Sequence, residues 1–392
     1  MIAFTFPGQG SQKPGTGEPW VDHPSWELVA EASDATGRDV DHLLRTADAD
    51  ELRQTRNAQL STFVASLLVL DAVERLGVEP VAYAGHSLGE YSALVAAGVL
   101  SFEDGARLVA ARGEAMQRAA DERAGTMAAV LGLDDDAVQV ACASVDGDVW
   151  VANYNAPGQV VIAGCPEAID QAATVAKDLG AKKVMPVDVS GAFHTPFMAP
   201  ARDRLRKAIG EADLRDSDVP VFANVDGRAH STAEEWAGLL AAQLCSPVRW
   251  RQTLHAMAET GCATFVELGP GSILSGMVKR TIDGTRPLSM NAPSDLDRLL
   301  EHLATSPPTG AVGTHEGEHL FATERLVVSP AAGVFEPAAG VDAGCAVEPG
   351  EIVGRVGEHD VRTPFAGTVM GVLASAGERV ATSQPVAWLR VA

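Results

Sequence analysis

Residues 81–100 constrain the fold most strongly, because a short apolar run, a glycine-flanked serine and an alanine-rich amphipathic run follow one another there. The centre of this segment is Gly85-His86-Ser87-Leu88-Gly89, a G-x-S-x-G sequence. We interpret the order as strand, sharp turn and helix, with Ser87 at the apex of the turn. Glycines flank the serine because side chains there would crowd so tight a turn. This context predicts a nucleophilic serine at a helix N-terminus, where free N–H groups can hold an oxyanion.

The surrounding segments predict an α/β fold with an insertion. Strand-like and helical segments alternate up to about residue 125, and further strands are expected at 219–224 and 263–267, which together favour a parallel sheet covered by helices. Residues 125–190 follow a β-α-β-β-α-β order, which is typical of a ferredoxin-like fold. We therefore expect a small ferredoxin-like subdomain inserted into a larger α/β domain.

Three further side chains are candidates because of their local setting. His194 lies in a loop of small residues, and histidine is the side chain best suited to take a proton from serine near neutral pH. Gln9 lies between two glycines directly after an expected strand at residues 2–6, where an amide is easily approached. Arg112 lies among apolar residues of a helix expected to start at Ser101, and its neighbours alone favour a surface arginine over a buried cation. The alternatives for the other two are a solvated loop histidine and an ordinary turn residue.

Composition excludes several classes of function. The net charge of −22 argues against nonspecific binding to nucleic acid or to an anionic membrane surface. No apolar run is long enough to span a membrane, and the first residues lack the basic region of a secretory signal. The five cysteines are scattered without C-x-x-C spacing, so we expect reduced thiols, no metal site and a cytoplasmic location.

The last part of the chain has a different character. Residues 305–319 have the composition of a linker, and residues 320–392 contain short valine-rich segments separated by glycine turns. This tail repeats itself: the sequence around Pro330 recurs around Pro364, and that around Gly344 recurs around Gly377. Two halves of four short strands each predict a small two-sheet sandwich with pseudo-twofold symmetry.

Residues 1 to about 295 resemble malonyl-CoA:acyl carrier protein transacylases. Seven ordered motifs support the resemblance: Phe6-Pro-Gly-Gln-Gly-Ser-Gln12, Gly85-His-Ser-Leu-Gly-Glu90, Arg112-Gly113 with Met116-Gln117, Asn153-Tyr-Asn-Ala-Pro-Gly-Gln-Val-Val-Ile-Ala-Gly164, Ala192-Phe-His194, Ser246-Pro-Val-Arg-Trp250 and Glu267-Leu-Gly-Pro-Gly271. The resemblance implies an α/β-hydrolase-like acyltransferase core over residues 1–304. It also implies malonyl transfer from malonyl-CoA to the phosphopantetheine thiol of an acyl carrier protein, without a metal or a prosthetic group, for fatty-acid or polyketide synthesis.

Each motif then gains an implied role. Ser87 resembles the nucleophile that takes the acyl group as an ester, and His194 resembles its general base. A backbone carbonyl, expected from the turn at residues 246–250, would orient the histidine in place of an aspartate. Gln9 and Leu88 resemble the residues whose backbone N–H groups form the oxyanion hole. Two roles concern the acyl group: Arg112 resembles the residue that binds the malonyl carboxylate, and Phe193 resembles one associated with malonyl rather than larger extenders.

The tail resembles a biotinyl/lipoyl carrier domain, most clearly at Val361-Arg-Thr-Pro-Phe-Ala-Gly367. Such domains are modified on a lysine in a central hairpin, here residues 353–359, but the chain has no lysine after Lys279. We therefore expect no attached biotin or lipoate, and a role in packing, oligomerisation or partner docking.

Two other functions remain open from the sequence. G-x-S-x-G alone also permits a thioesterase or another serine hydrolase, and the tail permits a scaffold protein. The partner expected from the resemblance is an acidic carrier protein, although this chain is itself acidic. Docking would then use local basic residues, for which the candidates are Lys182, Lys183, Arg202, Arg206, Lys279 and Arg280. The sequence does not distinguish the pathway or the oligomeric state, nor does it separate malonyl from substituted malonyl groups.

Overall fold

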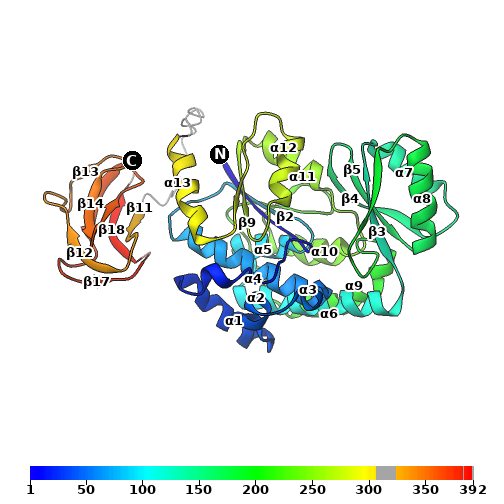
Figure 1. Cartoon of the computed structure of the whole chain (residues 1–392), viewed down its shortest axis with the longest axis horizontal. Coiled ribbons are helices and arrows are strands. Elements are labelled where there is room, and N and C mark those ends of the chain that lie inside the picture. Colours follow the sequence, from blue (N-terminus) through cyan, green and yellow to red (C-terminus); the bar gives the residue numbers. More distant parts are fainter. Residues whose placement is uncertain (306–323, 383, 391–392) are drawn as a thin grey trace. The chain divides into compact units, whose positions relative to one another are not determined.

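The computed structural model describes residues 1–305, 324–382 and 384–390, which form two compact units. The larger unit comprises residues 1–21, 26–70 and 80–291 (Figure 1). The second comprises residues 22–25, 71–79 and the described residues from 292 onward. From residue 306, the expected linker lies outside the described residues. No helix in the described part of the chain is long and apolar enough to cross a bilayer.

A six-stranded sheet forms the centre of the larger unit, in the order β10-β9-β1-β2-β7-β8. Its strands are β1 (Ile2–Phe6), β2 (Ala82–Gly85), β7 (Val221–Phe222), β8 (Ala229–His230), β9 (Thr264–Leu268) and β10 (Leu288–Met290). Neighbouring strands are parallel except β8, which is antiparallel to β7. The expected α/β fold is confirmed, and the expected parallel sheet has one antiparallel strand, β8, at its edge. A two-residue edge strand is too short to show any periodicity in the sequence.

Helices surround this sheet, and most follow from the sequence pattern. They are α1 (Glu27–Thr36), α2 (Val40–Arg45), α3 (Ala49–Arg53), α4 (Thr55–Glu74), α5 (Gly89–Ala96), α6 (Phe102–Glu122), α9 (Ala199–Glu211), α10 (Ala233–Gln243), α11 (Trp250–Glu259) and α12 (Ile273–Thr281). Almost every residue of α4 is buried, and its buried residues include polar side chains such as Gln59. Ser101 caps α6 by accepting a hydrogen bond from the Asp104 N–H at 3.1 Å, which confirms the predicted start of that helix.

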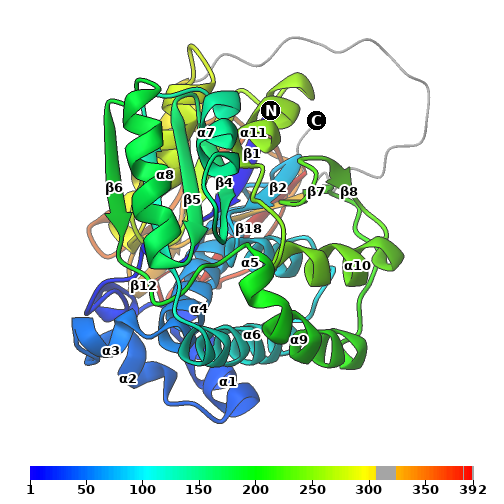
Figure 2. The same ribbon diagram turned by 90° about the vertical axis from the view of Figure 1, so that its right-hand side faces the viewer.

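The insertion has the β-α-β-β-α-β order predicted from the sequence. Its elements are β3 (Thr126–Leu131), α7 (Asp135–Ala143), β4 (Val149–Ala156), β5 (Gln159–Gly164), α8 (Pro166–Asp178) and β6 (Lys183–Val187). The four strands form an antiparallel sheet in the order β4-β5-β3-β6, and Figure 2 shows α7 and α8 against this sheet. Apolar side chains from both layers form one core.

One backbone connection ties the insertion to the rest of the larger unit. The Tyr154 N–H donates to the Val248 carbonyl at 2.8 Å, and the Val248 N–H donates to the Ala152 carbonyl at 2.8 Å. Strand β4 is therefore fixed to the segment that follows α10. This connection matters for function because residues of both segments lie close to Ser87 and His194.

The second unit contains α13 (Leu296–Thr305) and two four-stranded antiparallel sheets. Their strands are β11 (Glu324–Val328), β12 (Gly333–Pro337), β13 (Ala346–Val347), β14 (Ile352–Val356), β15 (His359–Arg362), β16 (Gly367–Val372), β17 (Arg379–Val380) and β18 (Pro385–Arg390). The sheet orders are β11-β18-β16-β13 and β15-β14-β12-β17. The two halves of the repeat are β11–β14 and β15–β18, so that β11 corresponds to β15, β12 to β16, β13 to β17 and β14 to β18. Replacing each strand by its counterpart converts one sheet order into the other. The predicted repeat of four short strands is therefore present in the structure, and both sheets contribute to one apolar core.

Candidate active site

Ser87 occupies the sharp turn between β2 and α5. Its φ of +52° lies in the left-handed region, which non-glycine residues rarely adopt. A Cβ on Gly85 would overlap the Gly89 carbonyl, and a Cβ on Gly89 would overlap the Phe6 carbonyl at the end of β1. The two glycines are thus required by close backbone approach, which is the physical basis of the G-x-S-x-G pattern.

His194 lies beside the serine. The hydroxyl Oγ of Ser87 is 2.7 Å from Nε2 of His194, and Nδ1 of His194 is 2.9 Å from the backbone carbonyl of Gln243. A carbonyl oxygen only accepts, so Nδ1 donates and Nε2 is the acceptor for the serine proton. The carbonyl at 2.9 Å belongs to Gln243 at the end of α10, whereas we expected it from residues 246–250; a backbone hydrogen bond to Ser246, in the expected turn, also acts on His194 by raising its pKa. The reason for the difference is that α10 continues to Gln243, whose carbonyl lies beyond the last intrahelical donors.

The protonation state of His194 also suits a base. Burial, and after it the nearby Arg112 guanidinium, lower its pKa to about 3. The imidazole is therefore neutral at pH 7 and free to accept a proton.

Arg112 is fully buried, so the expectation from its neighbours of a surface residue is wrong. Its guanidinium donates to Oε1 of Gln59 at 2.7 Å, to Oε1 of Gln243 at 2.9 Å and to Oγ of Ser87 at 3.1 Å. Within the described residues no carboxylate forms an ion pair with it, and burial lowers its pKa. Neutral amides therefore hold a buried cation next to the nucleophile. The periodicity of α6 does not predict the burial of Arg112, because its polar partners come from α4 and α10, which are distant in sequence.

A network of polar side chains under the turn was not predicted from the sequence. Nε2 of Gln243 donates to the Ser87 carbonyl at 2.8 Å and to Oε2 of Glu90 at 2.6 Å. Asn224 accepts from the Ser87 N–H at 2.6 Å, donates to the Gly85 carbonyl at 2.7 Å and donates from its own N–H to Glu90 at 2.6 Å. Burial raises the pKa of Glu90 to about 8, although these hydrogen bonds and Arg112 oppose the shift. The only sequence signal was a glutamate inside an otherwise apolar helix.

A second polar contact links the turn to the insertion. Nε2 of His86, the residue before the serine, is 2.9 Å from Oδ1 of Asn155 in β4. Burial lowers the pKa of His86, so this imidazole is neutral. Both residues lie within motifs quoted above, and no role was predicted for either from the sequence.

Gln9 and Leu88 both lie against the turn. Gln9 follows β1, lines the cavity that holds Ser87, and has its side-chain oxygen 3.5 Å from Nε2 of Gln59. Leu88 is the residue directly before α5, and its side chain is buried. Neither backbone N–H donates a hydrogen bond to any residue that the structure describes. Both donors are therefore available to an incoming group.

Gln9, Ser87 and His194 line a cavity of about 530 Å³, whose walls come from both the insertion and the rest of the larger unit. Phe193 also lines it and is 5% exposed. Apolar walls come from β3, β5 and α12. This volume suits a site for one small-molecule group. In the described part of the chain, no cluster of three or more His, Cys, Asp or Glu side chains could hold a metal ion.

Comparison with known proteins agrees with this geometry. Residues 3–294 match the acyl transferase domain family. The malonyl CoA-acyl carrier protein transacylase of Bacillus subtilis is 38% identical over 307 residues, which are 77% of this chain and 97% of that protein. The enzyme of the same name from Escherichia coli is 40% identical over 306 residues, with coverage of 77% and 99%.

Solved structures show the same relationship. An acyl carrier protein S-malonyltransferase from Vibrio cholerae superposes with a TM-score of 0.73 at 38% identity, covering 76% of this chain and 99% of that one. A malonyl-transacylase solved in complex with its type II polyketide-synthase acyl-carrier protein gives a TM-score of 0.74 at 38% identity, with coverage of 77% and 99%. The chain belongs to the acyl transferase family and, within it, to the malonyl CoA-acyl carrier protein transacylases.

Proposed function

We propose that this protein transfers a malonyl group from malonyl-CoA to the phosphopantetheine thiol of an acyl carrier protein, through an ester on Ser87. The observation that carries the proposal is the continuous chain of contacts from Ser87 to His194 and the Gln243 carbonyl, beside a buried Arg112. A base, a nucleophile and a cation for a carboxylate thus meet at one point.

Acylation begins when Nε2 of His194 takes the proton of the Ser87 hydroxyl and Oγ attacks the thioester carbonyl. The tetrahedral oxyanion accepts hydrogen bonds from the N–H groups of Gln9 and Leu88. When the intermediate collapses, the carbon–sulfur bond breaks and His194 returns the proton to the sulfur of coenzyme A. The carbonyl of Gln243 keeps Nδ1 protonated and stabilises the imidazolium while it exists.

Arg112 supplies the preference for a dicarboxylic acyl group. In the proposed complex the malonyl carboxylate binds the guanidinium, whose hydrogen bonds within the described residues go to neutral oxygens. An acetyl group would leave the buried cation without an anion, and an uncompensated buried charge costs roughly 3–5 kcal/mol. Phe193 would limit the space at the α-carbon of the acyl group. An extra methyl group at that carbon changes the binding free energy by only about 1–3 kcal/mol.

Deacylation repeats the chemistry with the carrier thiol. His194 takes the thiol proton, the sulfur attacks the ester carbonyl, and the serine oxygen leaves with that proton. The cycle is ping-pong, because coenzyme A departs before the carrier binds. Nothing in this scheme requires a metal or a prosthetic group, and the five free cysteines support a reducing, cytoplasmic location.

The finer description of the fold is also a proposal. A strand, a serine turn and a helix at the carboxyl edge of a largely parallel sheet support an α/β-hydrolase-like core. The two sheets of the tail each contain strands from both halves of the repeat, and this arrangement supports a biotinyl/lipoyl-like domain. Its hairpin between β14 and β15 turns at Gly357 and Glu358, which offer no lysine for a cofactor. We infer an unmodified domain that serves in oligomerisation or docking.

Docking of the carrier would use basic residues of the larger unit. The side chains of Lys182, Lys183, Arg206, Lys279 and Arg280 are exposed, whereas Arg202 is partly buried and paired with Asp203 at 2.9 Å. Two of these lysines lie on or beside the edge strand β6. Charge reversal there should slow transfer to the carrier more than acylation by malonyl-CoA.

The test is intact-protein mass after brief mixing with malonyl-CoA, acetyl-CoA or methylmalonyl-CoA, with Ser87→Ala as control. We expect an adduct of malonyl mass that the control lacks and that holo-carrier protein removes. Release of free coenzyme A without an adduct would instead identify a hydrolase. No adduct and no turnover would favour the scaffold function.

A further inference from the structure

Two charged side chains meet at the mouth of the active-site cavity. Arg53, the last residue of α3, has Nε 3.1 Å from Oδ2 of Asp188, which directly follows β6. Both residues line the cavity that contains Ser87 and His194. Close by, the hydroxyl groups of Thr55 and Ser190 are 3.2 Å apart. Contacts between the helical region and the insertion therefore cross this part of the cavity.

The ion pair between Arg53 and Asp188 is weak because both side chains are exposed to solvent. The Arg53 side chain is 53% exposed and that of Asp188 is 82% exposed, and a second carboxylate, Asp50, lies 3.0 Å from the same guanidinium. Exposed pairs of this kind contribute little to stability, because water competes with both partners. Asp188 can thus leave Arg53 and be rehydrated at little cost.

Arg53 also differs in charge from the other residues that line this cavity. Among the residues lining this cavity that the structure describes, it is the one lysine or arginine, and Asp188 is the one carboxylate. Both thioester partners of the proposed reaction have a phosphate at the end of the pantetheine arm opposite the sulfur. A protein of net charge −22 repels such anions over most of its surface, so a cation at the mouth has a large relative effect.

We propose that Arg53 binds a phosphate group of the incoming pantetheine substrate and that Asp188 is the internal anion which this phosphate displaces. The inference rests on the proposed function, because it takes the substrate from it. A guanidinium fork matches phosphate oxygens in a bidentate manner, and the phosphates of coenzyme A have more negative charge than one carboxylate. Substrate binding then exchanges one ion pair for a stronger one, and the link to Asp188 opens.

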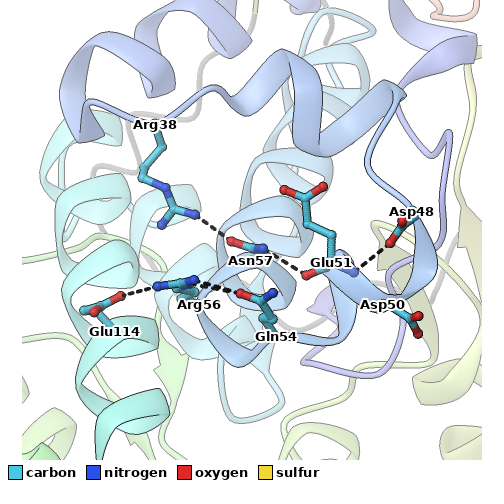
Figure 3. A pocket seen from close by; sticks show the side chains of 8 residues that line it. All are labelled: Arg38, Asp48, Asp50, Glu51, Gln54, Arg56, Asn57 and Glu114. Atoms are coloured by element: carbon cyan, nitrogen blue, oxygen red, sulfur yellow. Dashed lines mark hydrogen bonds and ion pairs between the residues drawn. The ribbon is translucent and has the colours of Figure 1, made fainter.

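A neighbouring pocket provides a contrast and a control. A depression of about 680 Å³ is lined by two arginines, Arg38 and Arg56 (Figure 3). There Arg38 donates to Asn57 at 2.6 Å, and Arg56 donates to Gln54 at 2.9 Å and approaches Glu114 at 3.8 Å. Four carboxylates line this pocket: Asp48, Asp50, Glu51 and Glu114. Its charge balance is unfavourable for phosphate, and Arg56 lies only three residues from Arg53.

The experiment compares malonyl-CoA with malonyl-pantetheine, which has the same thioester and no phosphate. We expect Arg53→Gln to lower kcat/KM for acylation by malonyl-CoA about fivefold to tenfold, through KM, and to leave malonyl-pantetheine within twofold. Asp188→Asn should improve the reaction with malonyl-CoA about twofold to threefold, because the competing anion is gone. Arg56→Gln should leave kcat/KM unchanged for both substrates.

Free coenzyme A gives a readout that needs no turnover. Titration calorimetry on the full chain should show about fivefold weaker binding to Arg53→Gln, tighter binding to Asp188→Asn and wild-type binding to Arg56→Gln. Equal affinities of wild type and Arg53→Gln, or equal losses with both thioesters, would overturn the role of Arg53. Failure of the wild type to form any acyl-enzyme would instead refute the proposed function, while the coenzyme A titration still decides the role of Arg53.

Discussion

The backbone carbonyl of Gln243 accepts a hydrogen bond from Nδ1 of His194 at 2.9 Å, while the side chain of the same glutamine accepts one from Arg112 at 2.9 Å. One residue at the end of α10 therefore orients both the base and the cation of the site. The two functions use different atoms, so a side-chain substitution separates them.

Gln243→Ala should weaken the malonyl preference and retain the base. The variant removes one of the hydrogen-bond partners of Arg112 and one of those of Glu90, but its backbone carbonyl remains for His194. A hydrogen bond to a charged group contributes about 1.5–3 kcal/mol, so acylation by malonyl-CoA should fall roughly 10- to 100-fold. Single-turnover mass spectrometry measures this rate. An unchanged rate would show that Arg112 needs no support from Gln243.

Arg112→Gln should change both acyl selectivity and pH dependence. Acylation by malonyl-CoA should fall 100-fold or more, whereas acylation by acetyl-CoA should fall much less, because no carboxylate is involved. Burial and then Arg112 hold the pKa of His194 low, so loss of the positive charge raises that pKa. The acid limb of kcat/KM for acetyl-CoA should therefore move to higher pH. A limb that stays in place would contradict electrostatic coupling between the two side chains.

The elements that the sequence predicts well are those with local signals. The turn at Ser87 has its own glycines, α6 has the Ser101 cap, and the insertion alternates strands and helices of ordinary length. Each of these depends on residues a few positions apart, which a single sequence displays directly.

The parts missed by the sequence depend on contacts between distant segments. Whether Arg112 is buried is decided by Gln59 and Gln243, which lie 53 and 131 residues away. The same holds for Glu90, whose partners Asn224 and Gln243 belong to the second half of the chain. Resemblance to a family identified Arg112, but the geometry of its amide partners required the fold.

Gly89→Ala should disrupt the protein, whereas Gly238→Ala should not. A Cβ at Gly89 would overlap the Phe6 carbonyl, so the turn and β1 must separate, and we expect little folded protein or a strongly lowered unfolding midpoint. Gly238 lies exposed within α10 with no atom within 4 Å of an added Cβ. Alanine there should raise stability by about 0.5–1 kcal/mol, since alanine favours helix. Thermal unfolding of both variants measures the contrast, and equal midpoints would contradict it.

Glu90 should make the folded state less stable as the solution becomes alkaline. Burial raises its pKa to about 8, above the ordinary value of 4.5, so its contribution is full below pH 4.5 and is lost as pH rises through 8. The pKa of His194 is lowered, which affects stability only below 6.5, and Glu74, with a pKa near 7, contributes mainly below that pH. Between pH 7 and 8 the wild type should therefore lose stability relative to Glu90→Gln, by at most about 1.4 kcal/mol per pH unit. Denaturant unfolding of both proteins across this range tests the slope. Parallel curves would mean that Glu90 stays ionised in the folded protein, with the hydrogen bonds from Asn224 and Gln243 outweighing its burial.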